Sequence, residues 1–235
     1  MEFQTLSTPS LKDLFVNTIQ SAILSGELKV GEKLPSEREF SEKMQVSRAV
    51  VNAGLSELMD RGLVEVRPRK GTYVADFKRN GNLETLNAIL DYRDISFADS
   101  SIRSLLEFRK LTDHLAVDRI IPTASDDEIK LLKKKINAMN RAETIEDTVS
   151  RALEYYHEFC YASGDMILPL IVMSFKESIS KLWTKYCRSY GTESLKYSLS
   201  QMFRYVEARD LEKAHQWADE TLNRSISGDR PVYDT

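Results

Sequence analysis

Two short helices with strong start signals lie within residues 34–74 and constrain the fold more than any other part of the chain. Ser36 opens the segment Ser-Glu-Arg-Glu, a capping box in which Ser36 and Glu39 satisfy each other's backbone N–H groups. Ser47 is placed to cap a second helix, and Gly62 ends it. The spacing therefore predicts a helix, a short turn and a second helix.

The segment after the second helix alternates between apolar and polar residues with the period of a β-strand. The alternation covers residues 63–67 and 72–76, and Pro-Arg-Lys-Gly at 68–71 supplies the turn between them. A helix pair followed by a hairpin is the arrangement of a winged helix-turn-helix, whose second helix enters the major groove of DNA. The alternative is a solvated hairpin beside two surface helices, with no ligand.

The distribution of charge favours the DNA-binding interpretation. The whole chain has a net charge of −3, which argues against a general nucleic-acid coat protein. Residues 61–79, however, contain six basic and two acidic side chains. Local positive charge is what a DNA-contacting wing requires. It also argues against a winged helix that contacts protein instead of DNA.

The candidate DNA contacts lie on three elements. Arginine can bond guanine bidentately and asparagine can bond adenine likewise, whereas small side chains let a helix approach the groove closely. On the predicted recognition helix the candidates are Ser47, Arg48, Ala49 and Asn52. Arg38 on the preceding helix is placed for a base or a phosphate. In the wing the candidates are Arg67, Arg69, Lys70, Gly71 and Thr72.

Three segments of this region resemble the GntR family of bacterial transcription regulators. They are Gly31-Glu-Lys-Leu-Pro-Ser-Glu-Arg-Glu39, Val46-Ser-Arg48 and Lys70-Gly-Thr-Tyr-Val74. The resemblance covers residues 11–76 and implies that Arg38, Arg48 and Gly71 contact operator DNA. The family usually has a second arginine where this chain has Asn52, so an altered operator is expected.

Beyond the wing almost every segment reads as helix. A connector at residues 78–82, with Arg, Asn and Gly, is predicted to separate a winged-helix domain, residues 1–77, from a second domain, residues 83–235. Helices are predicted at 83–92, 100–121, 126–141, 145–162, 167–190, 193–208 and 211–226. The expected fold is mostly α, with an N-terminal winged helix-turn-helix followed by an all-α helical-bundle effector domain.

The helical domain resembles the FadR subfamily of the same family, on looser motifs. These are Leu105-Leu-Glu-Phe-Arg109, the ten residues from Tyr156 to Asp165, and Asp210-Leu-Glu-Lys-Ala214. The resemblance implies a homodimer in which each head reads half of an inverted repeat. It also implies that a small effector in the bundle changes the spacing of the heads.

Many members of the subfamily hold a metal ion with one Asp and three His. Here His157 matches the first histidine, but the other ligand positions fall on Leu153, Leu199 and Thr221. No metal and no other cofactor is therefore expected. A metal-dependent sensor of small organic acids is the alternative within the family.

The loss of these ligands points to the metal-free branch, whose effector is a long-chain acyl-CoA. The resemblance places Arg109 and Tyr186 on effector-contacting positions, and an arginine fork suits a carboxylate or a phosphate. Tyr156, His157 and Trp183 complete the candidate effector site. The plain alternatives are an internal salt bridge for Arg109 and core packing for the aromatic residues.

Other classes of protein find little support. No apolar run approaches the ~18–20 residues of a membrane span, and the N-terminus lacks the features of a secretory signal. Only Cys160 and Cys187 are present, which fits a reducing cytoplasm. No nucleophile elbow, P-loop or dinucleotide fingerprint suggests an enzyme. The expected partners are a double-stranded DNA operator, a second copy of the chain and an organic acid or acyl-CoA.

Overall fold

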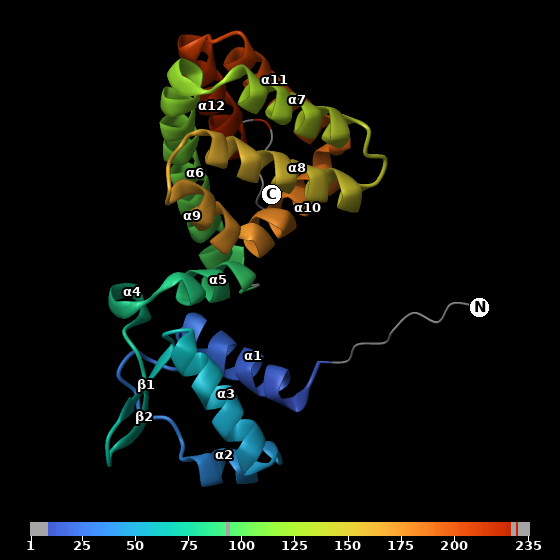
Figure 1. Cartoon of the computed structure of the whole chain (residues 1–235). Coiled ribbons are helices and arrows are strands. Elements are labelled where there is room, and N and C mark those ends of the chain that lie inside the picture. Colours follow the sequence, from blue (N-terminus) through green and yellow to red (C-terminus); the bar gives the residue numbers. More distant parts are fainter. Residues whose placement is uncertain (1–8, 93–94, 227–228, 230–235) are drawn as a thin grey trace, which may run out of the picture. The chain divides into compact units, whose positions relative to one another are not determined.

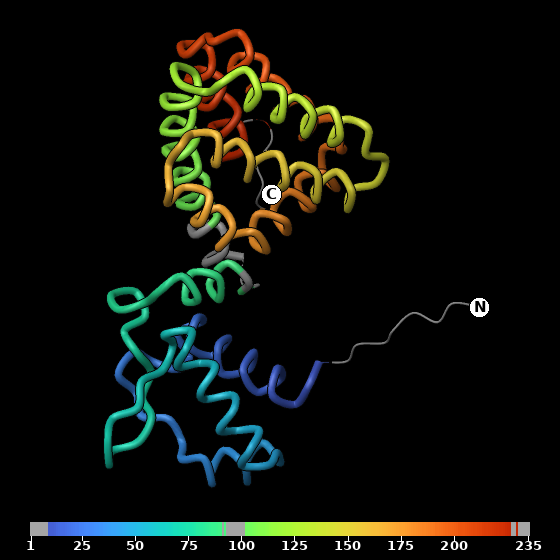
Figure 2. The backbone as a smooth tube through the Cα atoms, in the orientation of Figure 1, coloured from blue at the N-terminus to red at the C-terminus, as the bar shows by residue number. Residues whose placement is uncertain are grey.

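The computed structural model describes residues 9–92, 95–226 and 229, and the chain divides into two compact units, residues 1–94 and 95–235 (Figures 1 and 2). Both units are mostly helical, which confirms the predicted fold class. None of the helices in the described ranges is long and apolar enough to cross a membrane. The first unit contains α1 (Leu11–Leu24), α2 (Glu37–Met44), α3 (Arg48–Asp60), β1 (Val64–Arg67), β2 (Gly71–Val74), α4 (Phe77–Asn80) and α5 (Leu83–Asp91).

The helix pair starts where the capping residues predict. The Oγ atom of Ser36 accepts a hydrogen bond from the Glu39 N–H at 3.3 Å, and the Ser36 N–H donates to the Glu39 carboxylate at 2.8 Å. These bonds from Ser36 lower the pKa of Glu39. In the turn between α2 and α3, Gln45 adopts a left-handed conformation with φ +52°. The turn and both caps fix the direction in which α3 leaves α2.

A glycine allows α1 and α3 to pack closely. Gly54 lies in the interior of α3, and a Cβ atom at this position would overlap the ring of Phe15 on α1. Phe15 is buried and also meets Phe40 of α2 edge to face, with ring centroids 5.3 Å apart. Aromatic pairs prefer this geometry. One ring thus joins helices α1, α2 and α3.

The hairpin has a third extended segment beside it. β1 pairs with β2 in antiparallel register, with Val64 opposite Val74. The chain before α2 then pairs with the other edge of β2, where Lys33 faces Tyr73 and the Leu34 N–H donates to the Thr72 carbonyl at 2.9 Å. Residues distant in sequence therefore support the wing.

The division between the units differs from the predicted connector at 78–82. Helix α5 belongs to the first unit, because the side-chain amide of Gln20 donates to the Ala88 carbonyl at 3.1 Å. The hydroxyl of Thr85 donates to the Arg61 carbonyl at 2.6 Å. Asn82, which looked like part of a linker, caps α5 by accepting a hydrogen bond from the Thr85 N–H.

The second unit is a bundle of helices. Its longest helix, α6, packs mainly against α12, and α7 packs against α8 (Figure 1). The predicted helix 167–190 is interrupted at Phe175, a buried residue with φ −100° and ψ 10°. The elements are α6 (Ile95–Thr123), α7 (Asp126–Asn140), α8 (Ile145–Ala162), α9 (Leu168–Ser174), α10 (Lys176–Tyr190), α11 (Thr192–Glu207) and α12 (Leu211–Ile226).

Arg209 joins the end of α6 to the turn between α11 and α12. Its guanidinium donates to the carbonyl of Ile121 at 2.7 Å, and also to the carbonyls of Ile120 and Ala124. The last carbonyls of a helix lack partners within the helix, so a cation at this position satisfies them and interacts favourably with the helix dipole. Arg209 itself has φ +56°, which places its side chain for this contact.

Candidate nucleic-acid interface and helical-domain cavity

The first turns of α3 present the predicted base-reading residues to solvent. The Ser47 Oγ accepts a hydrogen bond from the Val50 N–H at 3.3 Å, which sets the start of the helix. Arg48, Ala49 and Asn52 are all exposed. The opposite side of α3 is buried in the core through Val51, Leu55 and Leu58. The core contact therefore fixes which side of the helix a groove could meet.

Arg38 on α2 lies in an adaptable position. Its side chain is 70% exposed and its Nε atom is 3.5 Å from the Glu42 Oε1 atom. An exposed pair of this kind contributes little to stability. The guanidinium can consequently leave Glu42 for a phosphate or a base at small cost.

The tip of the wing carries two unpaired cations. Arg69 and Lys70 are exposed, and within the described ranges no ion-pair partner lies against either side chain. The Lys70 N–H donates to the Arg67 carbonyl at 3.0 Å and closes the turn. Arg69 has φ +62° and Gly71 has φ +113°, a conformation that favours glycine. The turn thus directs two charges away from the sheet.

Arg67 differs from these two residues. Its Nε donates to Glu65 at 2.8 Å, and its guanidinium carbon lies 4.2 Å from the centroid of the Tyr73 ring. Its positive charge is therefore already compensated within the hairpin. The pairing follows from the strand period, since Glu65 and Arg67 are two residues apart and share a face.

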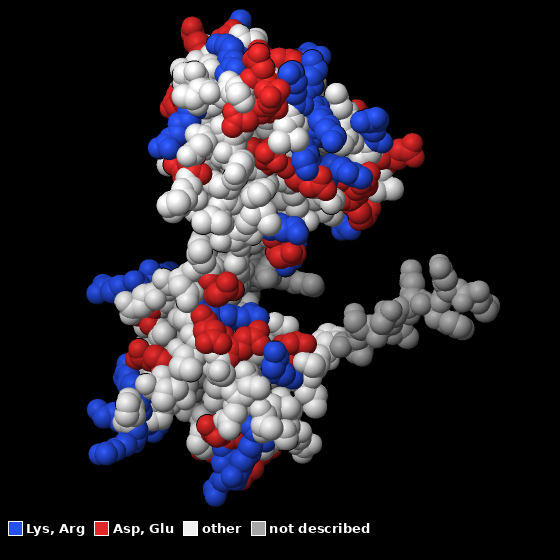
Figure 3. Space-filling view, in the orientation of Figure 1, with Lys and Arg blue, Asp and Glu red and all other residues white. Residues whose placement is uncertain are grey.

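Lys33 is a basic residue of the wing that the sequence did not reveal. It is exposed, and its Cε atom lies close to Gly71, 3.1 Å from where a Cβ atom would be. Thr72 is half-buried in the same strand, and its carbonyl is engaged by the third extended segment. In Figure 3 basic side chains gather at the end of the hairpin and again where α2 lies.

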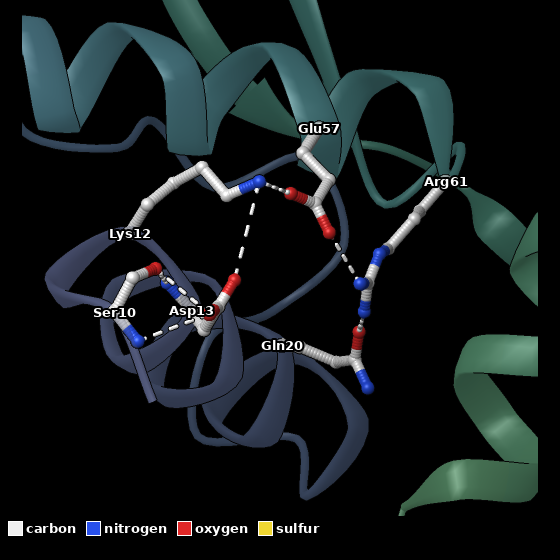
Figure 4. A network of polar contacts seen from close by, with 6 residues as sticks. All are labelled: Ser10, Lys12, Asp13, Gln20, Glu57 and Arg61. Carbon is white, nitrogen blue, oxygen red and sulfur yellow. Dashed lines mark hydrogen bonds and ion pairs between the residues drawn. The ribbon is translucent and has the colours of Figure 1, made fainter. Parts of the chain in front are cut away.

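Arg61 belongs to a different part of the head. Figure 4 shows its guanidinium between Glu57 and Gln20, with a 2.6 Å hydrogen bond to the Gln20 Oε1. Glu57 also accepts from Lys12 of α1 at 2.8 Å, and this contact lowers the pKa of Glu57. The network ties α1 to α3 and leaves Arg61 committed to the fold. Arg79 is likewise paired, with Asp76.

The second unit contains a cavity of about 70 Å³. Arg109, Tyr156, Trp183 and Tyr186, four of the five predicted effector residues, line it. His157 does not, because successive residues of a helix point about 100° apart. The rest of the lining is mostly apolar, with polar side chains at Thr112, Ser198, Thr221 and Ser225.

A buried ion pair lies in the wall of this cavity. The Arg109 Nε is 3.6 Å from the Asp113 Oδ2, and the Tyr156 hydroxyl donates to the Asp113 Oδ1 at 2.7 Å. Burial raises the pKa of Asp113. Burial opposes the charge of Arg109, but Asp113, Tyr156 and Cys160 together outweigh burial and raise the pKa of Arg109. The arginine is therefore charged and enclosed between the rings of Tyr156 and Trp183.

Two polar atoms in the wall of the cavity are buried without a hydrogen-bond partner. They are the Nε of Arg109 and the Oγ1 of Thr221. A buried unpaired donor costs about 1–3 kcal/mol, so a ligand that accepts from it recovers that cost. No group of three or more His, Cys, Asp or Glu among the described residues is placed to hold a metal ion.

Comparison with known proteins agrees with these features. Residues 15–74 match the family described as bacterial regulatory proteins, gntR family. The HTH-type transcriptional regulator Mce2R of Mycobacterium tuberculosis is 30% identical over 177 residues, which cover 75% of this chain and 73% of Mce2R. LutR of Bacillus subtilis, also an HTH-type transcriptional regulator, is 40% identical over 91 residues, 39% of each chain.

A solved structure has the same fold. Lar, described as controlling the expression of the Listeria monocytogenes agr system and mediating virulence, matches with a TM-score of 0.64 and 14% identity. The match covers 94% of this chain and 97% of the Lar chain. At this identity the likeness concerns the fold alone.

Proposed function

The chain belongs to the GntR family of bacterial regulatory proteins and is a DNA-binding transcription regulator; we propose that it is of the FadR type and binds a palindromic operator as a homodimer. The observation that carries this proposal is the exposed start of α3, with Arg48 and Asn52 beside a wing whose tip holds unpaired cations. A twofold dimer presents two such heads to the two halves of an inverted repeat. This function places the protein with DNA in the cytoplasm.

In this proposal the head divides its contacts between bases and backbone. Arg48 and Asn52 read base edges, and Arg38 contacts a base or a phosphate. The wing contacts phosphates through Arg69 and Lys70, and the small Gly71 lets its backbone approach closely. Phosphate contacts supply affinity and register, whereas base contacts supply sequence preference.

Selection of bound duplexes from a random-sequence library tests the assignment. Arg48→Ala is expected to lose about 1–3 kcal/mol of discrimination at one base pair while binding of unrelated duplexes at low salt changes little. Arg204→Ala, an exposed arginine on α11, removes the same charge far along the chain and is the control. An equal loss on selected and unrelated duplexes would contradict the role of Arg48.

Asn52 makes a second, sharper test possible. If Asn52 reads a base, Asn52→Arg is expected to change the preferred base at one step of each half-site, from adenine towards guanine. Unchanged selected sequences would remove Asn52 from the base-reading set.

The effector that this cavity supports best is a small organic acid with an apolar body. A carboxylate can accept from the Arg109 Nε and the Thr221 Oγ1, which are both buried without a hydrogen bond. The mostly apolar remainder of the wall suits a hydrocarbon portion. A cavity of about 70 Å³ has room for a few heavy atoms, and an acyl-CoA would require the helices to separate.

A thermal-shift screen of short organic acids, an acyl-CoA and divalent metal ions tests this choice. An acid that binds is expected to raise the melting temperature of the wild type, since a ligand stabilises the state that it binds. Arg109→Met and Thr221→Val should each weaken that shift, and Arg188→Met, an exposed arginine on α10, should not. Stabilisation by acyl-CoA alone, or only by an acid with a metal ion, would favour the other two effector classes.

A further inference from the structure

Helices α6 and α9 expose a set of large apolar side chains on their outer side. The exposed fractions are 69% for Leu111 and 39% for Leu115 on α6. At and before α9 they are 79% for Met166, 54% for Ile167, 61% for Leu170 and 44% for Met173. These six residues define the α6–α9 face.

The two helices are joined at one end of the face and line one cavity. Arg119 of α6 pairs with Asp165, just before α9, with 2.9 Å between the Arg119 Nη1 and the Asp165 Oδ2. Two turns before Arg119 on α6, Thr112 lines the same cavity as Val172 of α9. One row of residues on each helix thus points inward, and the neighbouring row points to solvent.

The α9 part of the face is also free of charge. Residues 166–175 contain no acidic or basic side chain, and the surface over α9 is white in Figure 3. Arg119 and Asp165 at its edge neutralise each other. The α9 part brought against a second copy of itself would therefore meet no like-charge repulsion, which favours a twofold contact centred on α9. On α6, Glu107 and Asp118 are exposed beside Leu111 and Leu115.

The area fits a dimer better than a free surface. At about 200 Å² for each fully exposed side chain of this size, the fractions above leave on the order of 700 Å² of exposed apolar residues. A standard interface buries about 800 Å² on each partner, of which roughly 56–65% is apolar. The α6–α9 face can supply that apolar share, and its exposed apolar area exceeds the roughly 300–600 Å² of the largest apolar patch on a typical monomer.

We propose that the α6–α9 face is the surface through which two copies of this chain pair. The inference rests on the homodimer of the proposed function and assigns its contact to named residues. Pairing removes Leu111 and Leu170 from water, and each buried residue of this kind favours association through the hydrophobic effect. The paired surface uses the outer sides of α6 and α9, which both belong to the helical unit.

Light scattering on size-fractionated full-length protein tests the proposal. The wild type is expected at twice the chain mass of 26.9 kDa, and Leu111→Asp and Leu170→Asp are each expected at the single-chain mass. Leu131→Asp on α7 is the control, since Leu131 is 39% exposed and lies outside the face. Circular dichroism of each variant establishes that the helices are retained, and the milder Leu111→Gln provides a second variant with the same expected direction.

Two results would overturn the proposal: a wild type at the single-chain mass at micromolar concentration, or face variants that keep the double mass. Binding of the wild-type monomer to neutral phospholipid vesicles would then identify a lipid surface as the occupant. DNA binding separates these results from failure of the proposed function. Face variants that remain dimeric on a palindromic duplex refute the interface alone, whereas a wild-type dimer that binds no DNA refutes the function and leaves the interface standing.

Discussion

The two cations at the wing tip give the most quantitative prediction. Each phosphate contact contributes about −0.9 to the slope of log K against log salt concentration on double-stranded DNA. Arg69→Gln with Lys70→Gln removes two unpaired charges from each head, so the slope should become shallower by ~1.8 per head, or ~3.6 for a dimer with both heads bound. Between about 50 and 200 mM salt, that difference changes the affinity ratio of wild type to variant roughly a hundredfold.

The neighbouring pair in the same hairpin provides a matched control. Arg67 is held by Glu65 and lies against the Tyr73 ring. Glu65→Gln with Arg67→Gln also changes two side chains per head, but it leaves the net charge unaltered. If Arg67 stays with Glu65 when DNA binds, the slope of this variant should equal that of the wild type.

Fluorescence anisotropy of a labelled duplex, titrated at several KCl concentrations, measures both slopes. An unrelated duplex suffices, because the counterion effect is independent of sequence. The reasoning is refuted if both double variants flatten the slope equally. It is refuted equally if the Arg69 and Lys70 variant keeps the wild-type slope.

Three further predictions concern stability, measured by thermal and urea unfolding. Gly54→Ala should destabilise the head by about 1–3 kcal/mol, because overlap with an aromatic ring of α1 outweighs the ~1 kcal/mol gain in helix propensity; an increase in stability would contradict the close packing. Arg209→Met should lower the free energy of unfolding by about 1–2 kcal/mol. The loss is smaller than the number of hydrogen bonds suggests, because water replaces part of them. Arg204→Met, at an exposed arginine, should leave the stability unchanged. Hydrogen bonds from Ser125 lower the pKa of Glu128 in the folded protein. The stability that the Glu128 carboxylate contributes is therefore fully present above its unfolded-state pKa of about 4.3, and it is lost as pH falls through the lower folded-state pKa. The melting temperatures of Glu128→Gln and wild type should therefore differ at neutral pH and converge at low pH; a difference independent of pH would exclude this cause.

Features set by residues three or four positions apart could be predicted from the sequence. Ser36 with Glu39, and Ser125 with Glu128, form capping boxes whose partners are both local, and the helices begin at these caps. The pairing of Arg67 with Glu65 was available from the strand period too. A count of basic residues in the hairpin does not show this pairing, because it does not distinguish Arg67 beside Glu65 from the free cations Arg69 and Lys70.

Features set by contacts across the fold could not be predicted. Lys33 joins the wing because its segment pairs with Tyr73, forty residues later. The connector at 78–82 contains Gly and Asn, which are typical of linkers, but its Asn82 caps a helix that Gln20 holds to the head. Composition cannot distinguish a cap from a linker when the deciding hydrogen bond comes from another helix.

The proposed interface and the cavity share helices α6 and α9, so ligand binding and dimerisation should be coupled. Thr112 and Val172 face the cavity, while Leu111 and Leu170 lie on the outer face. Packed helices transmit a displacement of one side to the other because protein interiors have little free volume. An acid that binds differently to monomer and dimer must change the dimer dissociation constant by the same factor by which dimerisation changes the affinity for the acid. Light scattering on the protein diluted with and without the acid measures the dimer dissociation constant. The acid should change this constant in the wild type and not in Arg109→Met. Identical dissociation constants at a saturating acid concentration would show that the two sides of these helices act independently.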